Sequence, residues 1–184
     1  MTRLVLLGRD GVINDDRADA VKTPDELVLL SGSAAAIARL NAAGVKVAVV
    51  TNQSAVGRGH LSVPALERIH AELRTRLARD GAHLDALLVC TDPPGRASPR
   101  LKPSPGMLLE ALRQFRATAD DTPMIGDDLH DLQAAKAAGC RRVLVRTGKG
   151  GAVQAAGVPL DLLPVAVHAD LAAAVESYLK GELW

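Results

Sequence analysis

The chain has 184 residues, of which 48% are hydrophobic and 23% are charged, as is ordinary for a globular protein with a substantial core. We expect one domain over residues 1–184. Its 22 basic and 21 acidic residues leave a formal charge of +1, which gives no electrostatic reason to expect nucleic acid or an anionic membrane as a partner. The two cysteines, the lack of a signal peptide and the lack of a long apolar run favour a cytoplasmic protein with reduced thiols, which we expect to be a monomer.

Short apolar runs alternate with helical patterns along the chain. Continuous Val/Leu runs are typical of strands buried on both faces, and their alternation with helices predicts an α/β fold with a doubly wound, mostly parallel sheet. Three segments (9–30, 91–106 and 147–164) are predicted to be loops. The predicted strands are 4–7, 45–50, 84–89, 123–125, 142–145 and 165–167, and the predicted helices lie near 33–43, 63–80, 105–117, 129–138 and 169–180.

Polar side chains follow four of the predicted strands. In a doubly wound sheet, ligands bind beyond the carboxyl ends of the strands, so these side chains are expected to converge. Lysine, hydroxyl and amide groups suit phosphate oxygens, and carboxylates suit Mg²⁺, so the set points to a phosphate ester and a divalent metal. In chain order the residues are Asp10, then Thr51, Asn52 and Gln53, then Lys102, and finally Asp127 and Asp128.

The stretches "RDGVIN", "TNQSAVGRG", "KPSPGM" and "GDDLHDLQAA" occur in that order at these strand ends. Together they resemble the haloacid dehalogenase (HAD) superfamily, over about residues 4–146. The match is nearest to its capless histidinol-phosphate phosphatases and D-glycero-D-manno-heptose 1,7-bisphosphate phosphatases. The resemblance implies a HAD-like Rossmannoid three-layer sandwich without a large cap domain, and hydrolysis of a phosphomonoester.

The first motif departs from the family pattern, which is Asp-x-Asp-Gly. This chain has Gly8-Arg9-Asp10-Gly11 instead. The resemblance places Asp10 on the general acid/base and Gly8 on the position of the nucleophile. Glycine has no oxygen that could attack phosphorus, so we expect catalysis to be severely impaired. Read alone, Gly8 could also be a simple strand terminator.

The resemblance also implies roles for the remaining candidates. Mg²⁺ is expected as the cofactor, held by Asp127 with Asp128 or Asp131 in support and by the Asp10 carbonyl, and weakened because position 8 lacks a carboxylate. The three acidic residues could equally cap the helix at 129–138. The expected substrate- and phosphate-binding residues are Arg9, Thr51, Asn52, Gln53, Arg58, Arg100 and Lys102.

A second departure lies in the third loop, where heptose bisphosphate phosphatases often carry a zinc site. Cys90 is retained, but Asp92, Ser98 and Arg100 stand at the other three ligand positions. One thiolate cannot form a closed tetrahedral site, so no structural zinc is expected. The arginine that usually precedes the lysine is Leu101 here, and Arg100 could substitute for it.

Three interpretations remain open at this point. The first is a phosphatase with a substituted nucleophile, acting on heptose 1,7-bisphosphate or, as an alternative, on histidinol phosphate. The second is a non-catalytic pseudophosphatase that binds a sugar phosphate. The third is that Gly8 is an engineered change or a sequence variant of an active enzyme.

Overall fold

The computed structural model describes residues 2–183. Its centre is a six-stranded sheet in the order β3-β2-β1-β4-β5-β6, in which every neighbouring pair is parallel. The predicted parallel, doubly wound sheet is therefore confirmed. The strands are β1 (Leu4–Leu7), β2 (Lys46–Asn52), β3 (Ala86–Cys90), β4 (Pro123–Gly126), β5 (Arg141–Val145) and β6 (Ala166–His168).

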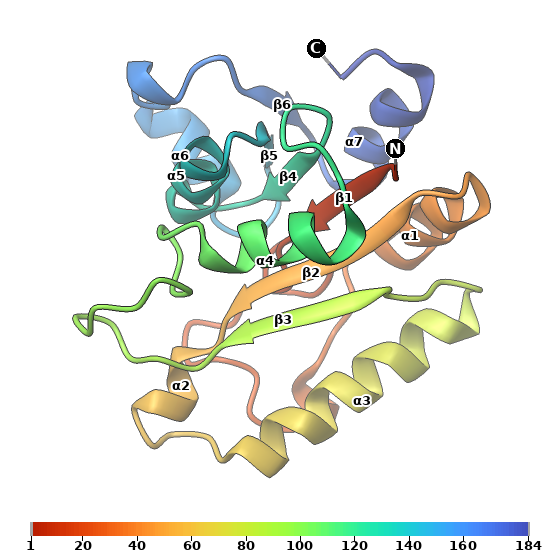
Figure 1. Ribbon diagram of the computed structural model, residues 1–184. Coiled ribbons are helices and arrows are strands. Elements are labelled where there is room, and N and C mark those ends of the chain that lie inside the picture. The colour runs from red at the N-terminus through yellow and green to blue at the C-terminus, as the bar shows by residue number, and fades with distance from the viewer. Residues whose placement is uncertain (1, 184) are drawn as a thin grey trace.

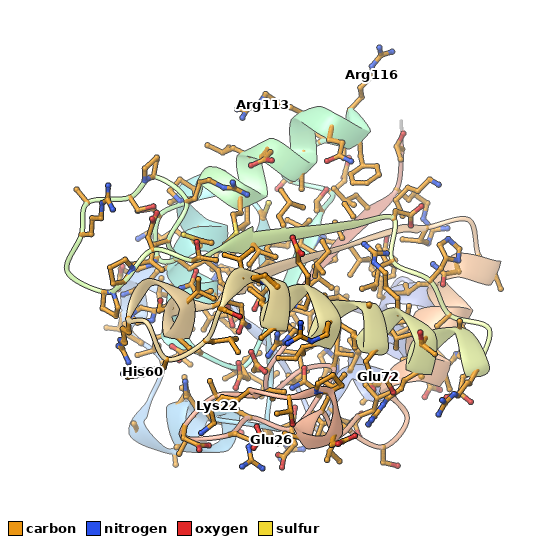
Figure 2. The ribbon with its side chains drawn as sticks, turned by 90° about the horizontal axis from the view of Figure 1, so that it is seen from below. Lys22, Glu26, His60, Glu72, Arg113 and Arg116 are labelled. Carbon is orange, nitrogen blue, oxygen red and sulfur yellow. The ribbon has the colours of Figure 1, made fainter. Side chains whose placement is uncertain are left out.

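Helices cover both faces of this sheet, which makes three layers. Figure 1 shows α4 and α5 on one side and α1 and α3 on the other, and in Figure 2 Arg113 of α4 and Glu72 of α3 lie on opposite sides of β3. The helices are α1 (Ser33–Ala42), α2 (Ser54–Gly57), α3 (Val63–Arg79), α4 (Gly106–Phe115), α5 (Leu129–Ala138), α6 (Gly150–Ala156) and α7 (Leu171–Lys180), with short 3₁₀ turns at Pro24–Glu26 and Leu160–Leu162.

The central strand β1 explains why its sequence is continuously apolar. Val5 and Leu7 belong to the core shared with α1, α3 and α7, whereas Leu4 and Leu6 belong to the core shared with α4 and α5. Successive side chains of a strand point to opposite faces, so a strand covered on both sides needs apolar residues at every position. All four side chains are buried, at 1% exposure or less.

Several helix ends follow from local sequence. Ser62 accepts a hydrogen bond from the Ala65 amide at the start of α3, and Asp170 accepts one from the Ala173 amide at the start of α7. Both are side-chain caps that satisfy amides left free by the first turn. The five predicted helices are confirmed within a few residues at each end.

Two short helices, α2 and α6, were missed because they lie in segments with turn-like composition. Helix α6 begins with Gly150, where a Cβ would lie 1.7 Å from the Val145 carbonyl oxygen. The glycine that argues against a helix in the sequence is therefore required by the close approach of α6 to the end of β5. No helix within residues 2–183 combines the length and apolar character needed to span a membrane.

Strand order reverses at β1, which lies between β2 and β4. Pairing with β4 continues past the end of β1, because the Gly8 amide donates to the Ile125 carbonyl at 2.9 Å. The arrowheads of β1, β2 and β3 point toward the side on which α2 and the segment 91–105 lie (Figure 1). A crevice at such a reversal point is where doubly wound folds bind ligands.

The segment 15–30 lies against α3. Arg76 of α3 donates to the carbonyl oxygens of Leu27 and Pro24. Figure 2 shows Lys22 and Glu26 of this segment beside α3, and the Lys22 amide donates to the Glu26 carboxylate at 2.8 Å. The segment predicted as a loop is thus held by specific backbone contacts.

Candidate active site

A polar pocket of about 180 Å³ lies at the carboxyl edge of the sheet. Its walls come from the ends of β1, β2, β4 and β5 and from the loop that precedes α4. The convergence expected from the sequence is therefore observed for most of the candidates. The pocket is lined by Gly8, Arg9, Asp10, Asp16, Thr51, Asn52, Lys102, Asp127, Asp128, His130, Asp131 and Lys149.

Asp10 presents a carboxylate that is surrounded by hydrogen-bond donors. Oδ1 accepts from Arg9 Nη2 at 2.7 Å and from Asn14 Nδ2 at 2.9 Å, and Oδ2 accepts from Gln53 Nε2 at 2.8 Å. Burial acts to raise the pKa of Asp10, but the Arg9 charge and the hydrogen bonds from Asn14 and Gln53 bring the pKa below its usual value. These contacts therefore favour the ionised form of the Asp10 carboxylate.

Lys102 carries a buried ammonium group whose direction is fixed. Its Nζ lies 2.6 Å from Asp131 Oδ1 and donates to the Val50 carbonyl at 2.8 Å. Asp131 in turn accepts from the backbone amides of Asp127 and Asp128 through Oδ2. Lys102 thus projects a positive charge into the pocket from a rigid support, as a phosphate-binding lysine requires.

Asp127 occupies a space that two glycines leave open. A Cβ at Gly11 would lie 2.0 Å from Asp127 Oδ2, and a Cβ at Gly148 would lie 2.2 Å from the same atom. The Lys149 backbone amide donates to this oxygen at 2.9 Å. Burial and the neighbouring carboxylate of Asp131 raise the pKa of Asp127 to about 7.

Gly8 lies at the end of β1 and faces the pocket. A Cβ built at this position would lie 3.0 Å from Val12 Cγ2 and 3.8 Å from Asp131 Oδ2. A side chain here would need Val12 to yield by a few tenths of an ångström and would then point toward the polar pocket. Glycine itself contributes no side-chain oxygen to the site.

Three of the predicted binding residues, Arg9, Asn52 and Gln53, make hydrogen bonds to other predicted site residues. Asn52 is tied to the backbone of Lys102, donating to its carbonyl and accepting from its amide at 3.0 Å each. Gln53 is buried and donates to both Asp10 and Thr51. Asn52 and Gln53 therefore hold other site residues in place, and Arg9 does the same for Asp10.

Three predicted substrate-binding residues do not line this pocket, namely Gln53, Arg58 and Arg100. Arg58 ends α2 at an exposed position, and Arg100 forms an ion pair with Glu110 of α4 at 3.4 Å. Both lie in segments around the pocket, so any role in binding would concern parts of a ligand that extend beyond it.

The expected helix-capping role is confirmed for Asp128 and Asp131. Asp128 accepts from the His130 amide at 3.0 Å, and Asp131 accepts from the Asp128 amide, which forms a capping box at the start of α5. Asp128 also lies 3.4 Å from Lys149 Nζ. Capping and a pocket-facing position coexist in Asp128 and Asp131.

Sequence reasoning missed Asp16, His130 and Lys149 at the rim. Lys149 Nζ lies 3.6 Å from Asp16 and 3.4 Å from Asp128, so it joins the segment after β1 to the segment after β4. Lys149 could have been found, because it follows β5 as the other candidates follow their strands. It was passed over because the Gly-rich sequence around it indicated an ordinary loop.

The positions compared with a zinc loop form a small hydrogen-bonded cluster. Cys90 Sγ lies 3.5 Å from Asp92 Oδ2 and 3.8 Å from Ser98 Oγ, and Ser98 Oγ accepts from the amides of Arg100 and Leu101. A hydroxyl and a carboxylate thus bridge this loop through hydrogen bonds.

The charges in the pocket favour a cation. Three cationic and five acidic side chains line it, which leaves a formal charge of −2 with His130 neutral. Within residues 2–183 no three His, Cys, Asp or Glu side chains are grouped as a metal site built from side chains alone would require. Mg²⁺, however, is commonly held by one or two carboxylates completed by waters and carbonyls. The buried carboxylate of Asp127 and the carbonyl of Asp10 are groups that suit such a set of ligands.

Comparisons with known proteins match this chain over nearly its whole length. The HAD-hydrolase-like family model matches residues 100–174. The chain is 40% identical to D-glycero-beta-D-manno-heptose-1,7-bisphosphate 7-phosphatase of Pseudomonas aeruginosa, covering 96% of this chain and 98% of the relative. It is 41% identical to the Bordetella bronchiseptica enzyme of that name, covering 97% of this chain and 98% of the relative.

Solved structures show the same relationship. The crystal structure of D,D-heptose 1,7-bisphosphate phosphatase from B. bronchiseptica, complexed with magnesium and phosphate, has a TM-score of 0.93 at 40% identity, covering 98% of this chain and 99% of that one. The corresponding protein of Burkholderia thailandensis has a TM-score of 0.75 at 38% identity, covering 97% and 99%. The similarity thus extends over nearly the whole chain in sequence and in fold.

Proposed function

This chain belongs to the D-glycero-D-manno-heptose 1,7-bisphosphate 7-phosphatase family of HAD hydrolases, and we propose that it carries that family's phosphomonoester site with hydrolysis impaired at Gly8. The observation that carries the proposal is the pocket in which Thr51, Lys102, Asp10 and Asp127 meet around a position without a nucleophile. The proposed substrate is heptose 1,7-bisphosphate, because the curated relatives act on it; histidinol phosphate is less favoured for the same reason.

The retained groups can bind and orient a phosphate ester. Lys102 supplies a buried positive charge, and the hydroxyl of Thr51 lines the same pocket and can donate to a phosphate oxygen. Mg²⁺, when bound by Asp127 and the Asp10 carbonyl, would offset negative charge on the phosphoryl group. None of these interactions requires a side chain at position 8.

The reacting steps need a carboxylate that position 8 lacks. With aspartate there, its oxygen would attack phosphorus and the bond to the ester oxygen would break. Because Asp10 is ionised before substrate binds, it would first take a proton from the bound phosphate monoester and then give that proton to the departing ester oxygen. Asp10 would then take a proton from water as that water attacks the phospho-aspartyl intermediate and releases phosphate. With Gly8 the first bond cannot form, and we expect turnover to fall by a factor on the order of 10⁴–10⁶.

The test compares three chains, each with Mg²⁺ and heptose 1,7-bisphosphate. Gly8→Asp should gain phosphatase activity, whereas the chain with Gly8 and the Gly8→Asn variant should stay low. Gly8→Asn is the matched control, because its Cβ meets Val12 at the same 3.0 Å but its amide is not a nucleophile. The enzyme interpretation fails if Gly8→Asp neither turns over sugar phosphates nor binds Mg²⁺.

A second candidate function is non-catalytic binding of a sugar phosphate. The observation that favours it is that Lys102, Asp131 and the surrounding hydrogen bonds are intact although position 8 is glycine. Saturable binding of heptose bisphosphate to the chain with Gly8 in calorimetry would support this function. Normal turnover by that chain would contradict both the impairment and the purely binding role.

A further inference from the structure

Arg9 has the largest fully buried side chain among the described residues, with 1% exposure. A buried guanidinium is costly unless its donors are satisfied. Nη2 and Nε both reach Asp10 Oδ1, at 2.7 and 3.2 Å, and Nη1 lies 2.9 Å from Nε2 of His70 on α3. His70, which is itself buried, therefore holds the side of the guanidinium that Asp10 does not reach.

The chemistry of this contact fixes the state of the imidazole. A guanidinium can only donate hydrogen bonds, so His70 Nε2 must be the acceptor and the ring proton must be on Nδ1. Burial and the adjacent Arg9 charge lower the pKa of His70 to about 4, which agrees with a neutral ring. His70 thus orients Arg9 without competing with it for the negative charge of Asp10.

The two oxygens of Asp10 are consequently unequal. Oδ1 accepts two hydrogen bonds from Arg9 and one from Asn14, which saturates its lone pairs. Oδ2 accepts only from Gln53 Nε2, and the same nitrogen lies 2.9 Å from Thr51 Oγ1. Oδ2 is therefore the oxygen on the Thr51 side of the pocket that has capacity for a proton.

We infer that His70 is a positioning residue that acts through Arg9 to anchor Asp10 Oδ1, so that Oδ2 alone exchanges the proton with the leaving group and with water. The inference rests on the proposed function, since it takes Asp10 as the acid/base. It adds a residue of α3, 61 positions from Arg9 in the chain, to the machinery of the site.

The first experiment uses the chain with Gly8 and requires no activity. Nitrogen-15 NMR of the histidine rings should show His70 neutral at pH 7, with the proton on Nδ1 and Nε2 as an unprotonated acceptor. A proton on Nε2, or a charged ring, would overturn the inference, because Arg9 could not then donate to it.

The second experiment uses Gly8→Asp as the background for substitutions at His70. His70→Phe removes the acceptor and should lower kcat by roughly tenfold while KM changes less than about twofold, as for other residues that orient a catalytic group. His70→Gln keeps an acceptor oxygen and should restore most of kcat. His83→Phe, at an exposed histidine, is the matched control and should leave both constants unchanged.

The outcomes separate the inference from the function on which it rests. If Gly8→Asp is inert, the proposed function fails and the NMR result still decides the Arg9–His70 contact. If Gly8→Asp is active and His70→Phe folds with unchanged kcat, the positioning role is wrong. If His70→Phe does not fold, His70→Asn, whose amide is too short to reach Arg9, takes its place with the same expected loss.

Discussion

Lys102 and Asp131 form an ion pair of 2.6 Å in which the two side chains are only 7% and 5% exposed. The pair joins the loop before α4 to the first turn of α5, and it faces the pocket. An ion pair with so little water around it depends on both partners, because either charge alone would be buried without compensation. Lys102, which we propose binds phosphate, is therefore also a structural element.

We expect Asp131→Asn to lower the free energy of unfolding by about 3–5 kcal/mol, since it leaves the Lys102 charge buried and unpaired. Urea unfolding measures this change. Asp161→Asn is the matched control, because the Lys136–Asp161 pair of 3.0 Å is 46% and 68% exposed, so water screens it and its loss should change stability far less. Equal losses for the two variants would contradict the structural role of Asp131.

Gly11→Ala should reduce stability more than the same substitution at Gly59. Gly11 has a φ of +76°, and its Cβ would overlap the Asp127 carboxylate, which would have to move. Gly59→Ala is the control, since Gly59 has the same φ but nothing within 4 Å of the added Cβ. We expect about 1–2 kcal/mol of destabilisation in the control from backbone strain alone. In urea unfolding, Gly11→Ala should lower the free energy of unfolding clearly more than Gly59→Ala does. In calorimetry, Gly11→Ala should also lose Mg²⁺ binding.

The buried imidazole of His70 should make stability depend on pH. Its pKa is about 4 in the folded chain and near 6.5 when unfolded, so the unfolded state binds more protons between these values. Above pH 6.5 the ring is neutral in both states and takes nothing from the free energy of unfolding. As the pH drops toward 4, this free energy falls by about 3 kcal/mol in total. His70→Gln should remove this part of the slope in urea unfolding between pH 4 and 7. An unchanged slope would show that the ring is protonated in the fold.

Phosphate binding should depend on a divalent cation even in the chain with Gly8. The five carboxylates and three cations of the pocket give a net negative field that opposes an anion until a cation enters. Calorimetry with inorganic phosphate should show binding with Mg²⁺ present and at least tenfold weaker binding in chelator. Binding that is equally strong in chelator would mean that Lys102 and Thr51 suffice.

The sequence was most informative where local pattern determines structure. Six apolar runs gave six strands, and the residues after β1, β2 and β4 reach one pocket because parallel strands end at a common edge. Short elements in Gly-rich or turn-like stretches, such as α6, were missed because the contact that requires Gly150 is made with Val145 of another element.

By itself, then, the sequence determined the parallel α/β fold, the family, and the glycine that stands two residues before Asp10. Only the tertiary structure decided the partners of the candidate residues. It ties Asn52 to the Lys102 backbone, places Arg58 and Arg100 outside the pocket, and brings His70 of α3 against Arg9. The physical reason is that periodicity and motif spacing encode local conformation and strand ends, whereas side-chain partners depend on how distant elements pack.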